Sequence, residues 1–402
     1  MAKIAIMGFG TVGSGVYDIV ETNSDKLHRN SGESVEIKYI LDIRDFDDHP
    51  KKHLFTKNFE DILNDSEVTV VAEVMGGLHP AYEFTKQLLL SGKSVVTSNK
   101  ELVATYGTEL LKIANEKNVN YMFEASVGGG IPIIRPLHQD LTANRIEKIA
   151  CILNGTTNYI LNEMIEEGKS FDDALKDAQN NGYAERNPAA DIEGHDACRK
   201  IAILSSLASG YEVDYNNIET EGITAVSLED VKYALGKKCA IKLIGYSEFM
   251  ENGKIYSIVA PMFVPQSSLL AHVHGVYNAV MVKGNCVGEL LFNGAGAGKL
   301  PTASAVVADI VDSIKHRLNS KKISWIKPDY EIVADKDDIK FEYFVRTNAS
   351  KAEIETVFGN VEYAEHIFDG EVAFTINKMT ATELNKKSQL LGKTISTYRI
   401  FD

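Results

Sequence analysis

The feature that most constrains this chain is a glycine-rich loop near its N-terminus, Gly8-Phe9-Gly10-Thr11-Val12-Gly13. It follows a short apolar run that is typical of a buried strand, and it opens a helical stretch. In this context the first glycine permits a tight turn, the second lets a pyrophosphate approach the backbone, and the third allows close helix–strand packing. The free N–H groups of the helix N-terminus favour an anion. The loop therefore predicts a dinucleotide-binding fold, with an ordinary glycine turn as the alternative.

Strands and helices alternate through the first third of the chain, which is typical of a parallel α/β sheet. The expected strands are Lys3–Met7, Glu36–Leu41, Val68–Val74, Ser94–Thr97 and Asn120–Glu124. The expected helices are Val12–Val20, Pro80–Leu90 and Leu102–Lys117. We therefore expect residues 1–135 to form a Rossmann-type dinucleotide-binding domain that uses NAD or NADP for redox chemistry.

The end of the second expected strand carries opposing signals about the coenzyme. An acidic residue there, Asp42, would bind the adenosine ribose of NAD, whereas Arg44 would pair with the 2′-phosphate of NADP. Asp42 lies 29 residues beyond Gly13 (42 − 13), later than the roughly 20 of the usual pattern. An inserted loop over Asn23–Ser34 would explain the excess. The choice between NAD and NADP stays open, as does the alternative that both side chains are merely solvated.

Beyond the cluster Gly128-Gly129-Gly130 the pattern changes to that of a second, mixed sheet. The expected strands are Ile146–Ile152, Lys254–Val264, Val276–Val282 and Val287–Phe292, and the expected helices are Thr157–Glu167, Phe171–Asn180 and Ile192–Leu207. A second glycine-rich loop, Gly294–Gly298, leads into a helix over Ala303–Leu318, which we expect to pack back on the first domain. Residues 136–325 are thus predicted to form an α+β substrate-binding domain.

The last stretch, residues 339–402, has an order of its own. Its expected elements are strand Lys340–Arg346, helix Lys351–Phe358, strands Val361–His366 and Glu371–Asn377, helix Thr380–Leu391 and strand Thr394–Ile400. This is the ferredoxin-like βαββαβ order, with Asp369-Gly370 as the hairpin turn between the middle strands. A small appended domain is expected.

Composition excludes several classes of protein. The formal charge of −14, from 42 basic and 56 acidic residues, argues against binding to nucleic acid or to an anionic membrane surface. The four cysteines are scattered without a CxxC pair, which is typical of reduced thiols in a cytoplasmic protein rather than of disulfides or a thiolate metal site. No apolar run of roughly 18 residues exists to span a bilayer. We expect a cytoplasmic protein with a small polar substrate.

The densest polar segment runs from Gly182 to Lys200. Asp191 is expected to cap the helix that follows it. Asp196 and Lys200 are four residues apart and therefore share one helix face. The alternative is an exposed helical salt bridge, worth only ~0.3–0.5 kcal/mol. Because Lys200 precedes the apolar run Ile201–Leu204, we expect its side chain not to point freely into water.

Two further polar segments follow expected strands. Ser98-Asn99-Lys100 comes after the fourth strand, and the carboxyl ends of strands in an open α/β sheet are where ligands bind. The alternative for this lysine is a surface position at a helix start. Asn154–Asn158 is either a polar loop over the site or a helix cap formed by Thr156 or Thr157. Tyr183 is either a substrate contact or a loop aromatic.

Six motifs, in order along about residues 1–320, resemble those of the homoserine dehydrogenase family. They are Gly8–Gly13, Ser98–Lys100, Glu124–Pro132, Ile152–Asn158, Gly182–Lys200 and Gly294–Thr302. The resemblance implies interconversion of L-aspartate 4-semialdehyde and L-homoserine with NAD(P)(H), in the pathway to threonine, methionine and isoleucine. It also implies a homo-oligomer, a dimer or tetramer, built through the sheet of the second domain, which would then be a dimerisation domain as well.

The resemblance also implies roles for single residues. Lys200 is similar to the family's catalytic lysine, a general acid in aldehyde reduction, and Lys100 to a lysine at the substrate and nicotinamide. The implied substrate residues are Glu185, Asp191 and Asp196, with Tyr183 as a further candidate. The implied coenzyme contacts are Gly8, Phe9, Gly10, Thr11, Val12, Gly13, Lys100 and Gly298, beside the candidate Arg44. A monovalent cation, Na⁺ or K⁺, is implied at Glu124, Val127, Gly129 and Ile131, mostly through backbone carbonyls.

The C-terminal stretch fits the family less closely. Many members carry an ACT domain there that senses threonine, and the βαββαβ order fits an ACT-like fold. After the first strand, however, the chain reads Arg346-Thr347-Asn348-Ala349-Ser350, without the Asp-x-Pro-Gly turn typical of ligand-binding ACT domains. Threonine feedback and a purely structural or oligomerising role both stay open.

Two other functions are compatible with the coenzyme loop. One is a different Rossmann oxidoreductase that acts on another amino-acid aldehyde or a 2-oxo acid. The other is a non-catalytic NAD(P)-sensing regulator with an ACT-like effector domain. The regulator leaves Lys100, Lys200 and the acids from Glu185 to Asp196 without a function, and the chain has no basic segment for DNA.

Overall fold

The structure is a computed structural model that describes all residues from Met1 to Asp402, and it divides into two compact units. Unit 1 contains Met1–Arg145, Ala202–Tyr215 and Gly294–Asp329. Unit 2 contains Ile146–Ile201, Asn216–Asn293 and Tyr330–Asp402. The C-terminal stretch therefore belongs to the same unit as the expected substrate region.

Unit 1 is built on a six-stranded sheet with the strand order β3-β2-β1-β4-β5-β6. Its strands are β1 (Ala2–Met7), β2 (Val35–Leu41), β3 (Phe55–Thr56), β4 (Val68–Glu73), β5 (Ser94–Thr97) and β6 (Tyr121–Met122). All neighbours pair in parallel. The order reverses between β1 and β4, and this switch point is where doubly wound sheets bind their ligands. The expected Rossmann-type sheet is confirmed.

The helices of unit 1 follow the expected pattern with one correction. The expected helices are present as α1 (Thr11–Thr22), α4 (Ala81–Leu90) and α5 (Lys100–Lys117), and a short helix α3 (Glu60–Leu63) precedes β4. The segment Asn23–Ser34, expected to be a loop, instead contains the helix α2 (Ser24–Ser31). Only Leu27 of this helix is buried, so its sequence lacks the apolar repeat that marks a helix.

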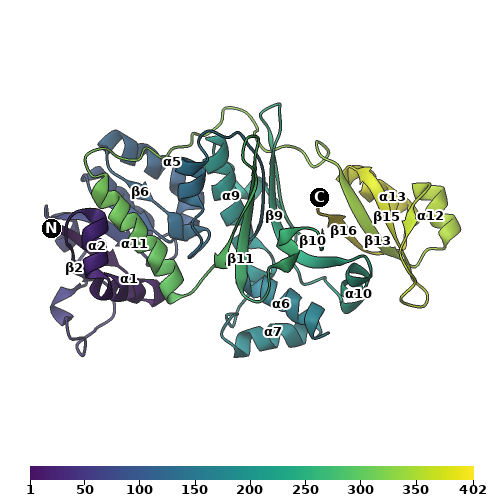
Figure 1. Cartoon of the computed structure of the whole chain (residues 1–402), viewed down its shortest axis with the longest axis horizontal. Helices are drawn as coiled ribbons and strands as arrows, with labels where there is room; N and C mark the ends of the chain where they lie inside the picture. Colours follow the sequence, from purple (N-terminus) through teal and green to yellow (C-terminus); the bar gives the residue numbers. More distant parts are fainter. The chain divides into compact units, whose positions relative to one another are not determined.

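A helix from far along the chain completes unit 1. Figure 1 shows α11 (Lys299–Lys315) beside α1 and α2, and its Ala303 and Ile310 share a core with Ile4 of β1. A Cβ on Gly15 of α1 would lie 2.8 Å from the Lys299 carbonyl oxygen. This glycine therefore lets α1 approach α11 at backbone distance.

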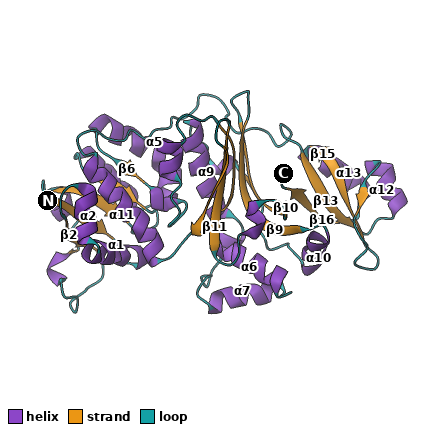
Figure 2. Ribbon diagram, in the orientation of Figure 1, coloured by secondary structure: helices purple, strands orange, loops and turns teal.

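Unit 2 is built on a mixed ten-stranded sheet with the order β12-β11-β7-β9-β10-β16-β13-β15-β14, and β8 also pairs with β10. Its strands, orange in Figure 2, are β7 (Ile146–Ile152), β8 (Glu219–Thr220), β9 (Cys239–Phe249), β10 (Ile255–Pro265), β11 (Tyr277–Gly284), β12 (Gly288–Ala295), β13 (Phe341–Thr347), β14 (Glu362–Tyr363), β15 (Val372–Met379) and β16 (Thr394–Ile400). The strand β9 was not expected, yet it lies between β7 and β10 and is buried along most of its length.

The helices of unit 2 are α6 (Gly155–Glu166), α7 (Phe171–Asn180), α8 (Ala189–Ile192), α10 (Leu228–Gly236), α12 (Lys351–Phe358) and α13 (Ala381–Leu391). The first part of α9 (His195–Ser209), up to Ile201, also belongs to unit 2, and the rest of this helix belongs to unit 1. The helix expected from Ile192 is broken at Gly194, which has a φ of +85°. Asp191 was expected to cap the following helix. It lies inside α8 instead and does not cap α9. Neither Thr156 nor Thr157 caps α6, because the Asn154 side chain accepts the hydrogen bond from Thr157 N.

The C-terminal stretch has the expected βαββαβ order, and its strands are arranged β16-β13-β15-β14. This is the ferredoxin-like arrangement. The last strand also pairs in parallel with β10, through Met262 with Arg399 and Phe263 with Ile400. The small sheet is therefore a direct continuation of the sheet of the substrate region.

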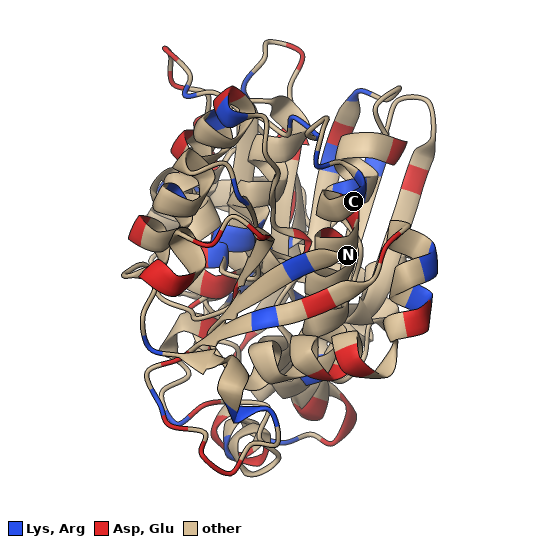
Figure 3. Ribbon diagram, turned by 90° about the vertical axis from the view of Figure 1, so that its left-hand side faces the viewer, with Lys and Arg blue, Asp and Glu red and all other residues tan.

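The surface charge follows the composition. Figure 3 shows acidic and basic residues interspersed along the ribbon rather than gathered in a basic stripe. None of the helices combines the length and the apolarity that crossing a bilayer requires.

Candidate functional site

The three glycines of the N-terminal loop differ in what surrounds them: contacts within the protein require Gly8 and Gly13, whereas Gly10 faces open space. Gly8 has a φ of +95°, and a Cβ on it would lie 2.9 Å from the Cα of Met75. A Cβ on Gly13 would lie 1.9 Å from the Gly8 carbonyl oxygen, so no other residue fits there. A Cβ on Gly10 would meet no atom within 4 Å. The space above Gly10, at the uncapped N-terminus of α1, fits the pyrophosphate of a dinucleotide.

This difference between the glycines gives a matched pair of variants. Gly10→Ala should leave the free energy of unfolding nearly unchanged but weaken NADPH binding at least tenfold, because the added methyl group fills the pyrophosphate space. Gly13→Ala should lower both stability and coenzyme affinity, because the loop must open to accept the methyl group. Urea unfolding and coenzyme fluorescence titration measure the two effects. Unchanged NADPH binding by Gly10→Ala would contradict this placement of the coenzyme.

Asp42 and Arg44, the two residues that gave opposite signals about the coenzyme, form an ion pair beside the glycine loop. The Asp42 carboxylate accepts the Phe9 backbone N–H at 2.7 Å and the Nε and Nη2 atoms of Arg44, each at 2.9 Å. These hydrogen bonds, first of all those from the Arg44 side chain, hold the pKa of Asp42 well below its usual range. A cleft of about 230 Å³ adjoins the pair and is lined by Arg44, Phe46, Lys57 and their neighbours. The structure thus places both candidates at one site.

The half-buried Phe9 ring is fixed by aromatic packing. Its ring lies 5.0 Å from that of Phe55 and 5.2 Å from that of Phe46, and it also meets Tyr17 and His49 edge to face. These contacts hold the glycine loop against the segment that follows β2.

Lys100 is positioned by a network at the carboxyl ends of β4 and β5. Buried Glu73 ends β4 and accepts the Thr97 hydroxyl at 2.6 Å. Asn99 caps the helix that Lys100 begins, and its amide donates to the Gly77 carbonyl at 2.6 Å. Burial raises the pKa of Glu73. Sequence reasoning did not single out Glu73, although an acid at the end of an otherwise apolar strand was a usable signal.

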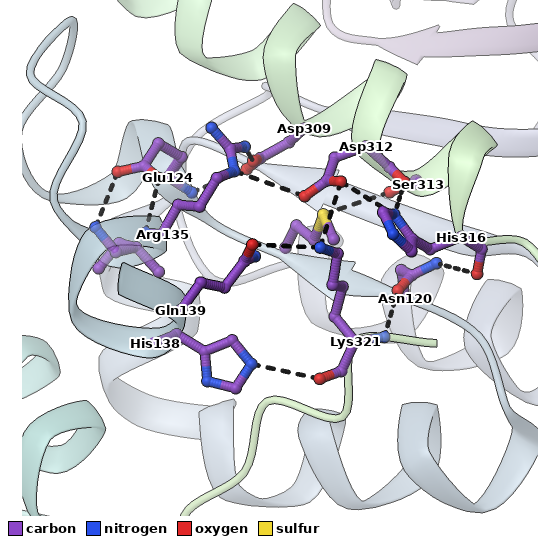
Figure 4. A network of polar contacts seen from close by, with 12 residues as sticks. Asn120, Glu124, Arg135, His138, Gln139, Asp309, Asp312, Ser313, His316 and Lys321 are labelled. Carbon is purple, nitrogen blue, oxygen red and sulfur yellow. Dashed lines mark hydrogen bonds and ion pairs between the residues drawn. The ribbon is translucent and has the colours of Figure 1, made fainter. Parts of the chain in front are cut away.

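The segment implied to bind a cation is held by buried charges. The Glu124 carboxylate accepts three backbone N–H groups, from Ile133, Ile134 and Arg135, at 2.6–2.9 Å. Asp309 of α11 accepts Glu124 N at 2.8 Å and Arg135 Nη2 at 2.6 Å (Figure 4). Burial, followed by the charge of Glu124, raises the pKa of Asp309. Backbone N–H groups thus take three of the roughly four acceptor positions of the Glu124 carboxylate.

The two later glycine clusters lie against each other within unit 1. The Gly130 N–H donates to the Ala295 carbonyl at 3.0 Å, and a Cβ on Gly129 would lie 2.2 Å from the Gly296 oxygen. Gly298, with a φ of +113°, then forms the N-terminal cap of α11. The implied cation loop and the implied second coenzyme loop are therefore in backbone contact. No group of three or more His, Cys, Asp or Glu side chains is arranged to hold a metal ion.

The polar residues of unit 2 converge on Lys200. Its side chain is buried, with 8% of the residue exposed, and Nζ donates to Asp196 Oδ2 at 2.8 Å and to the Leu153 carbonyl at 2.7 Å. The Asn154 amide donates to Asp191 Oδ1 at 2.7 Å and to Asp196 Oδ2 at 3.0 Å. The Asp196–Lys200 pair is therefore a buried ion pair, and the exposed salt bridge is excluded. Asn154 thus caps α6, a role that sequence analysis assigned to Thr156 or Thr157, and it also joins the two acids.

The other implied substrate residues are placed at the surface. Glu185 is exposed, and its carboxylate makes no hydrogen bond to Asn154 or to the two aspartates. Tyr183 is also exposed, its carbonyl accepts the Thr156 hydroxyl at 2.6 Å, and its ring lies 5.0 Å from that of Tyr159. Neither residue is joined directly to Lys200.

A second buried lysine was missed by sequence reasoning. Lys242 of β9 donates from Nζ to Asn158 Oδ1 at 3.0 Å, Asn162 Oδ1 at 2.7 Å and the Val273 carbonyl at 2.6 Å. Burial lowers the pKa of Lys242 to about 8. The lysine fixes α6, whose N-terminus carries Asn154. A lysine within the apolar run from Cys239 to Tyr246 was the available signal.

Comparison with known proteins identifies the family. The model described as "Homoserine dehydrogenase" matches residues 132–311, and "Homoserine dehydrogenase, NAD binding domain" matches residues 8–124. The homoserine dehydrogenase of Bacillus subtilis (strain 168) is 41% identical over 351 residues, which cover 86% of this chain and 80% of that protein. The chain belongs to the homoserine dehydrogenase family.

Solved structures of homoserine dehydrogenases share the fold. One from Thiobacillus denitrificans has a TM-score of 0.91 and 36% identity, with 100% of this chain and 98% of that chain covered. One from S. aureus at pH 7.5 has a TM-score of 0.82 and 32% identity, with 100% and 98% covered. A hyperthermophilic archaeal homoserine dehydrogenase in complex with NADPH has a TM-score of 0.66 and 30% identity, with 78% and 97% covered.

The two homoserine dehydrogenase models cover the candidate residues of each unit. The glycine loop and Lys100 lie within the coenzyme-binding model, and Asp191, Asp196 and Lys200 lie within the other. The segment from β13 onward lies outside both models.

Proposed function

We propose that this chain interconverts L-aspartate 4-semialdehyde and L-homoserine with NAD(P)(H), and that Lys200 is its proton donor and acceptor. Membership of the homoserine dehydrogenase family supports the reaction. The observation that supports the residue is the buried Lys200 ammonium, fixed by Asp196 and the Leu153 carbonyl. Aldehyde-dependent oxidation of NADPH or NADH tests the activity directly. If NAD(P)H is oxidised no faster with aspartate semialdehyde than with a 2-oxo acid, the chain is a different oxidoreductase.

Lys200 acts on the substrate oxygen. The coenzyme, when bound, supplies the hydride to the aldehyde carbon. Negative charge then grows on the aldehyde oxygen, where the Lys200 ammonium stabilises it and donates a proton from Nζ. In the reverse direction the amine of Lys200 accepts the homoserine hydroxyl proton. Asp196 orients Nζ.

The acidic residues near Lys200 are proposed to hold the substrate ammonium. Asp191 and Asp196 are fixed side by side by the Asn154 amide, which leaves two carboxylates oriented together. Glu185, on the exposed segment before α8, is proposed to join them, with Tyr183 as a further contact. Lys100 is proposed to act at the substrate and nicotinamide. An ammonium group matches two adjacent carboxylates in charge and hydrogen bonding.

We propose that the chain works as a cytoplasmic homo-oligomer and that its implied cation lies on backbone carbonyls. Carbonyls of Glu124, Val127, Gly129 and Ile131 are hard oxygen ligands suited to Na⁺ or K⁺. The three backbone N–H groups bound to the Glu124 carboxylate favour ligation by its carbonyl instead. Titration with coenzyme in NaCl, KCl and choline chloride tests the cation. If the dissociation constant of the coenzyme is the same in all three salts, the proposed cation is contradicted.

We propose further that NADPH is the preferred coenzyme. Both oxygens of Asp42 are occupied by Arg44 and the Phe9 N–H, so neither is left for a ribose hydroxyl. Arg44 is half exposed and lines the adjoining cleft together with Lys57. These cations suit a 2′-phosphate.

Replacing Arg44 with alanine should raise the KM for NADPH about tenfold or more and change the KM for NADH less than about twofold, because a hydrogen bond to a charged group contributes roughly 1.5–3 kcal/mol. Initial rates with each coenzyme measure the effect. Arg29→Ala, at an exposed position on α2, is the control. Equal effects of Arg44→Ala on both coenzymes would exclude a contact with the phosphate.

A further inference from the structure

One edge of β10 is shared by two segments from different parts of unit 2. The strand β8 pairs in parallel with β10 at Ile258 and Val259, and β16 pairs in parallel with the same strand at Met262 and Phe263. The hydrogen bond from Glu221 N to the Val259 carbonyl, at 2.7 Å, extends the first pairing by one residue. The end of β8 and the end of the chain therefore lie in succession along a single strand.

An arginine of the last strand joins these two segments. Arg399 is buried, with 7% of the residue exposed, and its Nη1 lies 2.7 Å from Glu221 Oε1. Its Nη2 lies 3.9 Å from Glu219, the first residue of β8, and its guanidinium lies 5.9 Å from the centre of the Tyr343 ring. Burying a charge is costly unless it is paired. A conformation that separated Glu221 from Arg399 would leave that charge without its closest partner.

The segment that Arg399 binds is packed against the turn between the two substrate acids. A Cβ on Gly222 would lie 2.4 Å from the Ile192 carbonyl oxygen and 2.7 Å from the Cα of Glu193. Ile223 N donates to that same Ile192 carbonyl at 2.8 Å. A Cβ on Gly194 would lie 3.0 Å from Thr220 Cγ2. The contacts of Gly222 and Ile223 are between backbones, so a shift of the segment displaces the turn.

The turn Ile192–Gly194 lies between two of the proposed substrate residues, Asp191 and Asp196. Asp191 precedes Ile192 directly, and Asp196 follows Gly194 by two residues. Both acids are joined by Asn154, and Asp196 holds Lys200.

We propose that Arg399 is a positioning residue for the substrate: through Glu221 it holds Glu219–Ile223 against the turn Ile192–Gly194 and so sets the places of Asp191 and Asp196. This rests on the proposed function of those acids. It gives the C-terminal strand a part in substrate binding that needs no effector. Coupling through packed contacts of this kind changes affinity by roughly 2- to 30-fold.

The test compares two buried arginines of the C-terminal stretch. Arg399→Met should raise the KM for homoserine about tenfold, with the dissociation constant of NADPH changed less than about twofold. Arg346→Met is the matched control, because Arg346 is equally buried and ion-paired but binds Asp230 and Glu371, not the segment Glu219–Ile223. It should lower the unfolding temperature yet leave the KM for homoserine within about twofold. Equal changes in KM from the two variants would overturn the proposal.

A double-mutant cycle separates positioning from general destabilisation. Because Arg399 acts through Glu221, the double variant Arg399→Met with Glu221→Gln should have the same KM as Arg399→Met alone, and Arg399→Lys should restore part of the affinity. Additive effects on KM would show that the two residues act independently and would overturn the proposal.

Hydrogen exchange gives a readout that does not depend on activity. In Arg399→Met, amides of residues 189–200 should exchange faster than in the wild type, and in Arg346→Met they should not. If the wild-type protein fails to oxidise NADPH with aspartate semialdehyde, the proposed function fails, while this exchange pattern still decides whether Arg399 holds the turn. Unchanged exchange at 189–200 in Arg399→Met would refute the structural link itself.

Discussion

Replacing Lys200 with alanine is expected to reduce turnover of aspartate semialdehyde by at least about a thousandfold. The ammonium both stabilises the growing negative charge on the aldehyde oxygen and donates the proton, and a positioned acid alone contributes roughly 10²–10⁴-fold. The loss should therefore be in kcat, because these interactions strengthen in the transition state. Steady-state kinetics with saturating NADPH measure it.

Two further measurements make the Lys200 result specific. NADPH binding should persist in Lys200→Ala, because the glycine loop and its supports belong to unit 1. Lys176→Ala, an exposed position on α7, should keep wild-type rates. Near-normal turnover by Lys200→Ala would remove this lysine from the mechanism and return attention to other oxidoreductase chemistries.

Replacing Asp230 with alanine is expected to lower the free energy of unfolding by about 3–5 kcal/mol, the usual cost of removing one partner from a buried ion pair. Asp230 is 1% exposed and accepts hydrogen bonds from Arg346 Nη1 at 2.7 Å, Ser396 at 2.6 Å and Tyr398 at 2.9 Å, besides those from Ser227. All of these donors would lose a buried acceptor. Arg346 would retain Glu371 and the Ser227 hydroxyl but lose the charge that faces its Nη1.

Urea unfolding followed by circular dichroism measures this loss. Glu353→Ala, which removes an exposed capping-box acid from α12, should cost only about 1 kcal/mol and is the control. Because Asp230 lies on α10 and its partners on β13 and β16, the destabilised variant should still unfold unit 2 in one transition. A loss no larger than that of Glu353→Ala would mean that the network contributes little to stability.

The sequence predicts helix bounds well where a capping residue marks the start of the helix. The helices Phe171–Asn180 and Lys351–Phe358 have the expected bounds, and each is preceded by a serine whose hydroxyl accepts a backbone N–H three residues on. Five of the six strands of the first sheet and the βαββαβ order follow from strand and helix periods, whereas the two-residue strand β3 was not expected. Whether the last stretch is ACT-like in more than its order stays a prediction.

The errors arise where tertiary contacts outweigh local pattern. Lys242 and Ser247 interrupt the apolar run of β9, and only their distant partners, among them Asn158 and Ser257, make them suitable for the interior. The strand therefore lacked a clear signature. Asp191 has the side chain of a helix cap, but the chain turns at Gly194 before α9 begins.

In the candidate site, too, local sequence predicts some features, and others depend on the tertiary fold. A four-residue spacing on one helix predicts the Asp196–Lys200 pair, whereas its burial depends on how unit 2 folds. No local pattern connects Arg399 with Glu221, which are 178 residues apart. Such pairs become visible only once the sheet order is known.

The continuity of the sheet bears on how the C-terminal stretch should be studied. Threonine feedback is best examined by adding threonine to the full chain, because truncation past about residue 335 removes the partner of β10. The uncovered edge would run along Met262, Phe263 and Val264, an apolar strand with unpaired N–H and C=O groups. Edges of this kind pair with other chains and aggregate. In this protein β16 thus also protects β10, one of the two longest strands of the fold, against self-association.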